Sequence, residues 1–237
     1  MRRVQCDVTA WENIIAISAG DDCTVGLHND GTVSVTGYVI GDTSECKNWR
    51  NIVAVSASAS FVVGLKLDGT VVATKPEYEF ISDVGQTNVS KWTDIVAVSA
   101  GLDHTLGLRA DGTVVAAGSS EEKQCNVSSW KNIVIPASGD ARLGVDVSKT
   151  YNELFAQYAG WPMGVYINSI TSESCAEKAG IETGDIITRF DGIEINSFDE
   201  LRGALKRHFA GDIVEIEVYH KGDLHTITVV LDKVPSE

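Results

Sequence analysis

Short apolar runs alternate with turn-forming residues through the first 137 residues of the chain. Residues 52–55 and 105–108 are short runs of β-branched and other apolar residues bounded by turn formers, which is typical of strands. Asp111-Gly112 separates the second run from a further apolar run at 113–117. Asp-Gly in this setting favours a tight hairpin in which both residues adopt positive φ. The pattern predicts small antiparallel sheets without helices.

The same pattern recurs in register along the chain. Segments that begin at Trp11, Trp49, Trp92 and Trp130 share one sequence pattern, and the first three continue into a second shared block that contains Asp-Gly. A repeat of about 40 residues with three or four short strands is typical of a propeller blade. Three full repeats and a fourth that stops after its first strand are predicted.

These repeats resemble the regulator-of-chromosome-condensation repeat over roughly residues 4–140. The resemblance is carried by the Trp-x-Asn/Asp-Ile start, the Ser-Ala-Gly turn, the Gly-Leu strand and the Asp-Gly-Thr-Val hairpin. It implies a β-propeller, which closes with at least about four blades. An unclosed propeller leaves unpaired strand edges, which favour pairing with another chain. We therefore expect a partial or oligomer-completed propeller. Either copies associate through the repeat half, or further sequence outside this chain completes it.

The periodicity changes after residue 137. Residues 150–159 have helical spacing, and 164–170 read as a strand. Ser197 and Glu200 form a capping box that starts a helix ending at about His208. Residues 214–218 alternate like a half-buried strand. We therefore expect two domains, the repeats at 1–138 and a second domain at 139–237, in a mainly β protein.

The second domain resembles a PDZ domain of the permuted bacterial kind attached to trypsin-like quality-control proteases. The matching segments are 142–145, 163–167, 174–181, 184–187 and 191–192, followed by the helix around 199–201. The resemblance implies a β-barrel-like sheet with two or three helices and a groove that accepts an extended peptide as an added strand. The peptide-binding residues that it implies are Arg142, Leu143, Gly144, Val145, Asp146, Val147, Leu201 and Leu205.

Each of these assignments has a structural alternative. Leu143-Gly144-Val145 also aligns with the Gly-Leu strand of a fourth repeat. Leu201 and Leu205 could belong to the core alone, and Arg142 could be a solvated surface charge. The resemblance implies that the amides of Leu143-Gly144-Val145 surround a terminal carboxylate, and Gly144 permits the close backbone approach that this requires.

The negative net charge of the chain limits the classes of partner that it can bind. The net charge is −14, and acidic residues outnumber basic ones in both predicted domains. Binding to nucleic acid or to an anionic membrane needs clustered Lys and Arg, so neither is expected. No apolar run approaches the roughly 20 residues of a membrane-spanning helix, and the first residues lack the apolar region of a secretory signal. A cytoplasmic location is expected.

Catalytic and cofactor chemistry find little support in the sequence. No Gly-x-Ser-x-Gly or Gly-Asp-Ser-Gly segment occurs, and the five histidines are scattered. The five cysteines contain no Cys-x-x-Cys pair, and Cys6 and Cys125 each lie five residues before a repeat Trp. We expect both to be small buried residues, and we expect no metal, no cofactor and no enzymatic activity.

The sequence thus predicts a non-catalytic scaffold whose second domain binds an extended or C-terminal peptide of a partner protein. An alternative is that the repeat surface binds and inhibits or regulates a partner enzyme, with the second domain accessory.

Overall fold

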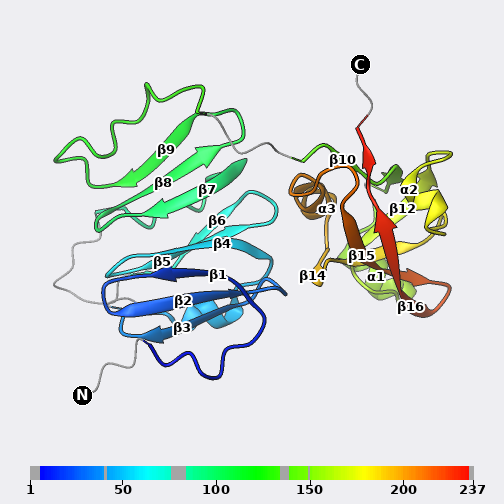
Figure 1. The fold of residues 1–237 in the computed structure, drawn as a ribbon, viewed down its shortest axis with the longest axis horizontal. Coiled ribbons are helices and arrows are strands. Elements are labelled where there is room, and N and C mark those ends of the chain that lie inside the picture. The colour runs from blue at the N-terminus through cyan, green and yellow to red at the C-terminus, as the bar shows by residue number, and fades with distance from the viewer. Residues whose placement is uncertain (1–5, 40–41, 76–83, 134–138, 149, 235–237) are drawn as a thin grey trace. The chain divides into compact units, whose positions relative to one another are not determined.

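The computed structural model describes residues 6–39, 42–75, 84–133, 139–148 and 150–234. The chain divides into two compact units, Met1–Ile135 and Pro136–Glu237, which we describe separately. Both consist mainly of strands (Figure 1). No helix among the described residues is long and apolar enough to cross a membrane.

Three antiparallel sheets of three strands each form the first unit, one for each full repeat predicted from the sequence (Figure 1). The first strand of every sheet carries a β-bulge at the same place in its pairing with the second strand. A short 3-10 helix, η1 (Ser44–Asn48), connects the first two sheets. The strands are β1 (Ile14–Ala19), β2 (Cys23–His28) and β3 (Val33–Gly37); β4 (Ile52–Ala57), β5 (Val62–Lys66) and β6 (Val71–Ala73); and β7 (Ile95–Ala100), β8 (His104–Arg109) and β9 (Val114–Gly118).

Buried tryptophan rings pack against mid-strand glycines of the sheets. Trp49 and Trp92 are each 8% exposed. The Trp49 ring covers Gly64 so closely that a Cβ on that glycine would lie 3.0 Å from the ring, and the corresponding distance between Gly107 and Trp92 is 2.8 Å. A glycine in mid-strand therefore makes room for the ring. Trp49 shares a core with apolar residues of β2, which joins the first sheet to the second.

Backbone hydrogen bonds repeat between neighbouring sheets. The amides of Ile52 and Ile95 donate to the carbonyls of Gly31 and Gly69 of the preceding hairpins, each at 3.0 Å. The amide of Ile133 makes the equivalent bond to Gly112 at 3.2 Å. A fourth repeat therefore begins as predicted, and its continuation through 134–138 lies outside the described residues.

The Asp-Gly hairpins differ from the sequence prediction in one respect. Only the glycine has a positive φ, for example +77° at Gly31. The Gly31 amide donates to the His28 carbonyl at 3.0 Å, and the His28 amide donates to the Thr32 carbonyl at 2.9 Å. This is a three-residue loop with a bulge at the glycine. Asp30 acts through its side chain, whose Oδ1 accepts from the Thr32 amide and hydroxyl at 2.9 and 2.7 Å.

The expectation that Cys6 and Cys125 are buried is wrong for Cys6, which is exposed, while Cys125 is half-buried. The Cys125 thiol donates to the carbonyl of Ser119, which directly follows β9 of the preceding repeat. No preceding repeat strand is described for Cys6 to pack against. Cys23, Cys46 and Cys175 are buried.

These environments predict selective thiol reactivity. Burial raises the pKa of Cys46 to about 12, so its reactive thiolate is scarce at neutral pH. We expect a maleimide to modify Cys6 first in the folded protein, and Cys46 only in denaturant. Peptide mass mapping after timed labelling measures this. Native labelling of Cys46 as fast as of Cys6 would contradict the burial described here.

The second unit is built on a sheet whose strand order is β11-β12-β13-β15-β16, with β14 paired to β13. β11 is therefore an edge strand of this sheet. A two-stranded ribbon, β10 with β17, holds the segment that precedes β11. The strands are β10 (Ala141–Arg142), β11 (Val145–Val147), β12 (Val165–Ile170), β13 (Ile186–Phe190), β14 (Ile193–Glu194), β15 (Ile213–His220), β16 (Asp223–Val230) and β17 (Asp232–Lys233).

Side-chain caps begin the three helices found among the described residues of this unit, α1 (Glu153–Ala159), α2 (Cys175–Lys178) and α3 (Phe198–Leu205). Asn152, Ser174 and Ser197 each accept a hydrogen bond from an amide three residues on. The predicted capping pair is present with one change. Ser197 accepts from the Glu200 amide at 3.3 Å, but the Glu200 carboxylate accepts at 2.7 Å from the amide of Asn196, one residue before the cap. The α3 helix ends at Leu205, before the predicted His208.

Candidate functional site

The free edge of β11 offers main-chain hydrogen-bonding groups. Val145 lies opposite Ile170 and Val147 opposite Ile167 on β12. The Thr171 amide donates to the Gly144 carbonyl at 2.8 Å, and the Ser148 amide donates to the Tyr166 carbonyl at 2.9 Å. Along a strand, successive residues direct their N–H and C=O groups to opposite sides. The residues on either side of a residue bonded to β12 therefore point these groups away from β12. Val145 and Val147 therefore present theirs at the open edge.

Leu143 and Gly144 form a tight loop between β10 and β11. The Leu143 side chain is 1% exposed and anchors the loop in the core. Its carbonyl accepts from the Ala176 amide at 3.2 Å, and the Gly144 carbonyl faces Thr171, so both carbonyls are engaged. Among the hydrogen bonds between described residues, none uses the amide of Leu143 or Gly144. These amides, with that of Val145, are available for an anion such as a carboxylate.

Gly144 is required by the shape of this loop. Its φ is +81°, and a Cβ at this position would lie 2.3 Å from the Cβ of Ser174. A residue other than glycine would suffer both backbone strain and a steric clash.

Arg142 lies on β10 opposite Asp232. Its guanidinium donates to the Thr171 hydroxyl at 3.2 Å. Arg142 lines an open cavity of about 290 Å³, together with residues 171–174, Asp232 and Lys233. Because Ser174 also adjoins Gly144, this cavity borders the loop. A role for Arg142 in attracting a carboxylate stays a prediction.

That α3 forms the other wall of the groove stays a prediction from the sequence. The Ala141 amide donates to the His208 carbonyl at 3.3 Å, which ties the segment after α3 to the strand before the loop. Leu201 is 1% exposed and belongs to the core, so it offers no surface to a ligand, whereas Leu205 is half-buried. Phe198, seven residues before Leu205 on the same helix face, is 53% exposed. Phe198 was not among the peptide-binding residues predicted from the sequence, although its seven-residue spacing from Leu205 places both on one helix face.

Two histidines of this unit each lie close to an aspartate side chain from another segment of the domain. His220 Nδ1 lies 2.5 Å from Oδ1 of Asp185, which is 2% exposed. His208 lies 3.5 Å from Asp191 and 3.4 Å from Asp212. Within the described residues, no three His, Cys, Asp or Glu side chains are placed to hold a metal ion.

Family models match a segment in each unit of the chain. The PDZ domain model matches residues 141–231, and the regulator of chromosome condensation (RCC1) repeat model matches residues 95–124. Both resemblances inferred from the sequence are confirmed, and the second unit contains a PDZ domain.

Similar proteins match the PDZ region. A probable periplasmic serine protease do/HhoA-like of Haemophilus influenzae is 32% identical over 89 residues, which cover 38% of this chain and 18% of the relative. Serine protease Do-like HtrB of Bacillus subtilis is 35% identical over 92 residues, which cover 37% of this chain and 20% of the relative. This chain thus spans about a fifth of the length of these relatives, and no protease domain is shown in it.

Two solved structures each match less than half of the chain. The HtrA3 PDZ domain bound to a phage-derived ligand (FGRWV) has a TM-score of 0.35 and 20% identity, and the match covers 40% of this chain and 86% of that one. Yeast RCC1 (Prp20), solved with Kap60, has a TM-score of 0.36 and 18% identity, and the match covers 46% of this chain and 30% of that one.

Proposed function

We propose that the PDZ domain binds the C-terminal segment of a partner protein and that the chain acts as a non-catalytic scaffold, with the repeats as its second part. The open edge of β11 carries this proposal. An extended peptide placed antiparallel to β11 pairs with the outward N–H and C=O groups of Val145 and Val147. Its terminal carboxylate then meets the amides of the loop at Gly144.

The walls of the groove define the peptide class. Leu205 is half-buried and Phe198 is 53% exposed, so the helix offers apolar contacts. Asp146 is exposed on the edge strand between the two valines. We therefore expect an apolar C-terminal residue with a free carboxylate, and no requirement for nucleic acid, membrane or cofactor.

A peptide array tests this proposal. Peptides randomised in their last four residues are displayed with a free carboxyl terminus, and each has a matched version ending in an amide. We expect the full-length protein to select apolar C-termini and to bind the amides at least about tenfold more weakly, because buried hydrogen bonds to a charged group contribute about 1.5–3 kcal/mol. Equal binding of acids and amides would refute carboxylate recognition.

Exposed apolar residues on β1 support a second candidate function, in which the repeat surface binds a partner enzyme. Ile15 and Ile17 are 58% and 72% exposed. Their counterparts in the second sheet are less exposed, because Val53 is 9% exposed and Val55 is half-buried. Partners that are retained by a Gly144→Val protein but lost from an Ile15→Lys/Ile17→Lys protein would use this surface. If every partner is lost from the Gly144→Val protein, the repeat surface has no independent binding role.

A further inference from the structure

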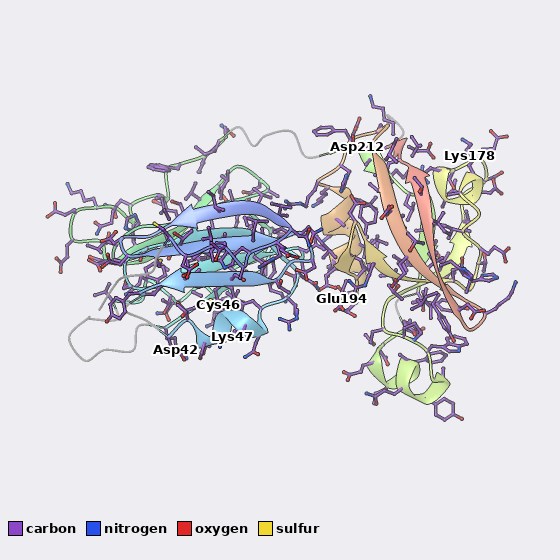
Figure 2. All side chains as sticks on the ribbon, turned by 60° about the horizontal axis from the view of Figure 1, so that its bottom comes forward. Asp42, Cys46, Lys47, Lys178, Glu194 and Asp212 are labelled. Atoms are coloured by element: carbon purple, nitrogen blue, oxygen red, sulfur yellow. The ribbon has the colours of Figure 1, made fainter. Side chains whose placement is uncertain are left out.

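Four aromatic rings gather near the end of β11 that is remote from Gly144. Tyr151 stacks on Tyr166 with ring centroids 5.7 Å apart, and Trp161 stacks on Tyr166 at 6.3 Å. Phe155 contacts Tyr151 and Trp161 edge-on at 5.7 and 6.2 Å. We call Tyr151, Phe155, Trp161 and Tyr166 the aromatic cluster. Figure 2 shows α1, in pale green, projecting from the sheet with side chains directed outward.

The cluster continues the line of the edge strand. The Ser148 amide pairs with the Tyr166 carbonyl directly after β11 ends. The Ser148 hydroxyl then accepts from the amides of Thr150 and Tyr151, each at 3.2 Å, which turns the chain toward α1. The Tyr151 hydroxyl donates to the Pro162 carbonyl at 2.5 Å and fixes the ring over Tyr166. The edge strand therefore leads directly to the aromatic cluster.

The helix beside the cluster exposes apolar side chains that the fold does not bury. Leu154 and Tyr158, one helical turn apart, are 78% and 93% exposed. Phe155 and Trp161 are 49% and 38% exposed. Ala156 is the buried residue of this helix. We call Leu154, Phe155, Tyr158 and Trp161 the α1 apolar face; an exposed patch of this kind is typical of an interaction site.

We propose that the α1 apolar face binds the upstream part of the same peptide whose carboxylate lies at Gly144, through an aromatic or large aliphatic side chain. This inference rests on the proposed function. A peptide antiparallel to β11 runs from Gly144 toward Ser148 and advances about 3.3 Å per residue. Residues roughly five to eight positions before the C-terminus then lie beyond Ser148, beside Tyr151 and α1.

Charge restricts this upstream segment further. The α1 helix carries one acidic residue, Glu153, in its first turn and no basic residue in its last turn. Burial of the apolar face next to Glu153 disfavours an acidic neighbour in the peptide. The preferred partner therefore ends in a neutral or basic segment of at least eight residues that carries an apolar residue in its upstream half.

A selection from ten-residue peptides with free carboxyl termini tests the inference with the full-length protein. We expect two separate preferences, one at the C-terminus and one for Phe, Tyr, Trp or Leu five to eight residues before it. The selected peptide and its last four residues alone are then compared by fluorescence polarisation. Leu154→Ala/Tyr158→Ala should weaken the ten-residue peptide roughly tenfold and leave the four-residue peptide unchanged. Leu224→Ala, at a residue that is 56% exposed on β16, is the matched control.

The outcomes separate this inference from the proposed function. The inference is overturned if the selected peptides show a C-terminal preference but no upstream preference. It is also overturned if the double variant weakens the affinity for the ten-residue and four-residue peptides equally. In both cases the proposed groove at β11 stands. No selected consensus at either position removes the proposed function. A concentration-dependent dimer that disappears in the double variant, with peptide affinity unchanged, would assign the face to a second copy and would also overturn the inference.

Discussion

Gly144→Val is expected to abolish peptide binding, with a loss of affinity of at least about a hundredfold, or roughly 2.7 kcal/mol. Two effects act together. Valine does not tolerate the +81° φ of this position, and its Cβ would lie 2.3 Å from the Cβ of Ser174. The loop must therefore move, and its amides lose their common direction. Fluorescence polarisation with a peptide chosen by the array measures the loss.

Two further variants keep this prediction falsifiable. Gly192→Ala places a side chain at a similar φ of +79°, where no atom lies within 4 Å, so it tests backbone strain away from the groove and should retain affinity. Gly144→Ala/Ser174→Gly removes the steric neighbour and should recover part of the binding. Full affinity of Gly144→Val, with circular dichroism and melting unchanged, would remove the carboxylate loop from the site.

Trp49→Ala is expected to lower the free energy of unfolding of the first unit by roughly 3–5 kcal/mol, as for other buried aromatic residues. The ring is 8% exposed and lies against Gly64, so its removal leaves a cavity between the first and second sheets. The side chains of β2 and β4 cannot close this space without moving whole strands. Urea unfolding followed by far-ultraviolet circular dichroism measures the change.

Trp130→Ala supplies the matched control, because Trp130 begins the fourth repeat but is 49% exposed. A half-exposed side chain contributes less burial, so its loss should cost under about 1 kcal/mol. Equal destabilisation by the two substitutions would show that Trp49 does not hold the stack together in the way its burial implies.

The repeat architecture was predictable because the same pattern occurs several times. Where one repeat departs from the pattern, the corresponding positions of the other repeats still indicate the strand or turn. The Trp start and the Asp-Gly hairpin recur in register, and the strands follow from them. The conformation of Asp30 was not predictable from the dipeptide alone. Asp-Gly is compatible with two hairpin geometries, and the one adopted here depends on Thr32, whose amide and hydroxyl bind the Asp30 carboxylate.

The candidate site could be predicted as a loop and a strand, but not as a helix face. Leu143-Gly144-Val145 was assigned to the loop through its resemblance to PDZ domains, and the +81° φ of Gly144 requires a glycine there. Leu201 and Leu205 belong to one apolar stripe, and a stripe does not reveal which residues the sheet covers. The structure buries Leu201 and leaves Phe198 half in solvent, a division that depends on tertiary packing.

That the α1 apolar face is exposed could not be predicted from the sequence, because its exposure also depends on tertiary packing. The spacing of Leu154 and Tyr158 predicts a helix with one apolar side, and such a side is normally buried. Whether another element covers it depends on contacts far along the chain.

The repeated bonds from Ile52 to Gly31 and from Ile95 to Gly69 bear on how the first unit loses its structure. Each joins a sheet only to its immediate neighbour, as in a one-dimensional array. The middle sheet, β4–β6, is hydrogen-bonded to a complete sheet on each side. Val62 and Val63 of its strand β5 are fully inaccessible to solvent. Melting should therefore start at the outer sheets and reach β5 last.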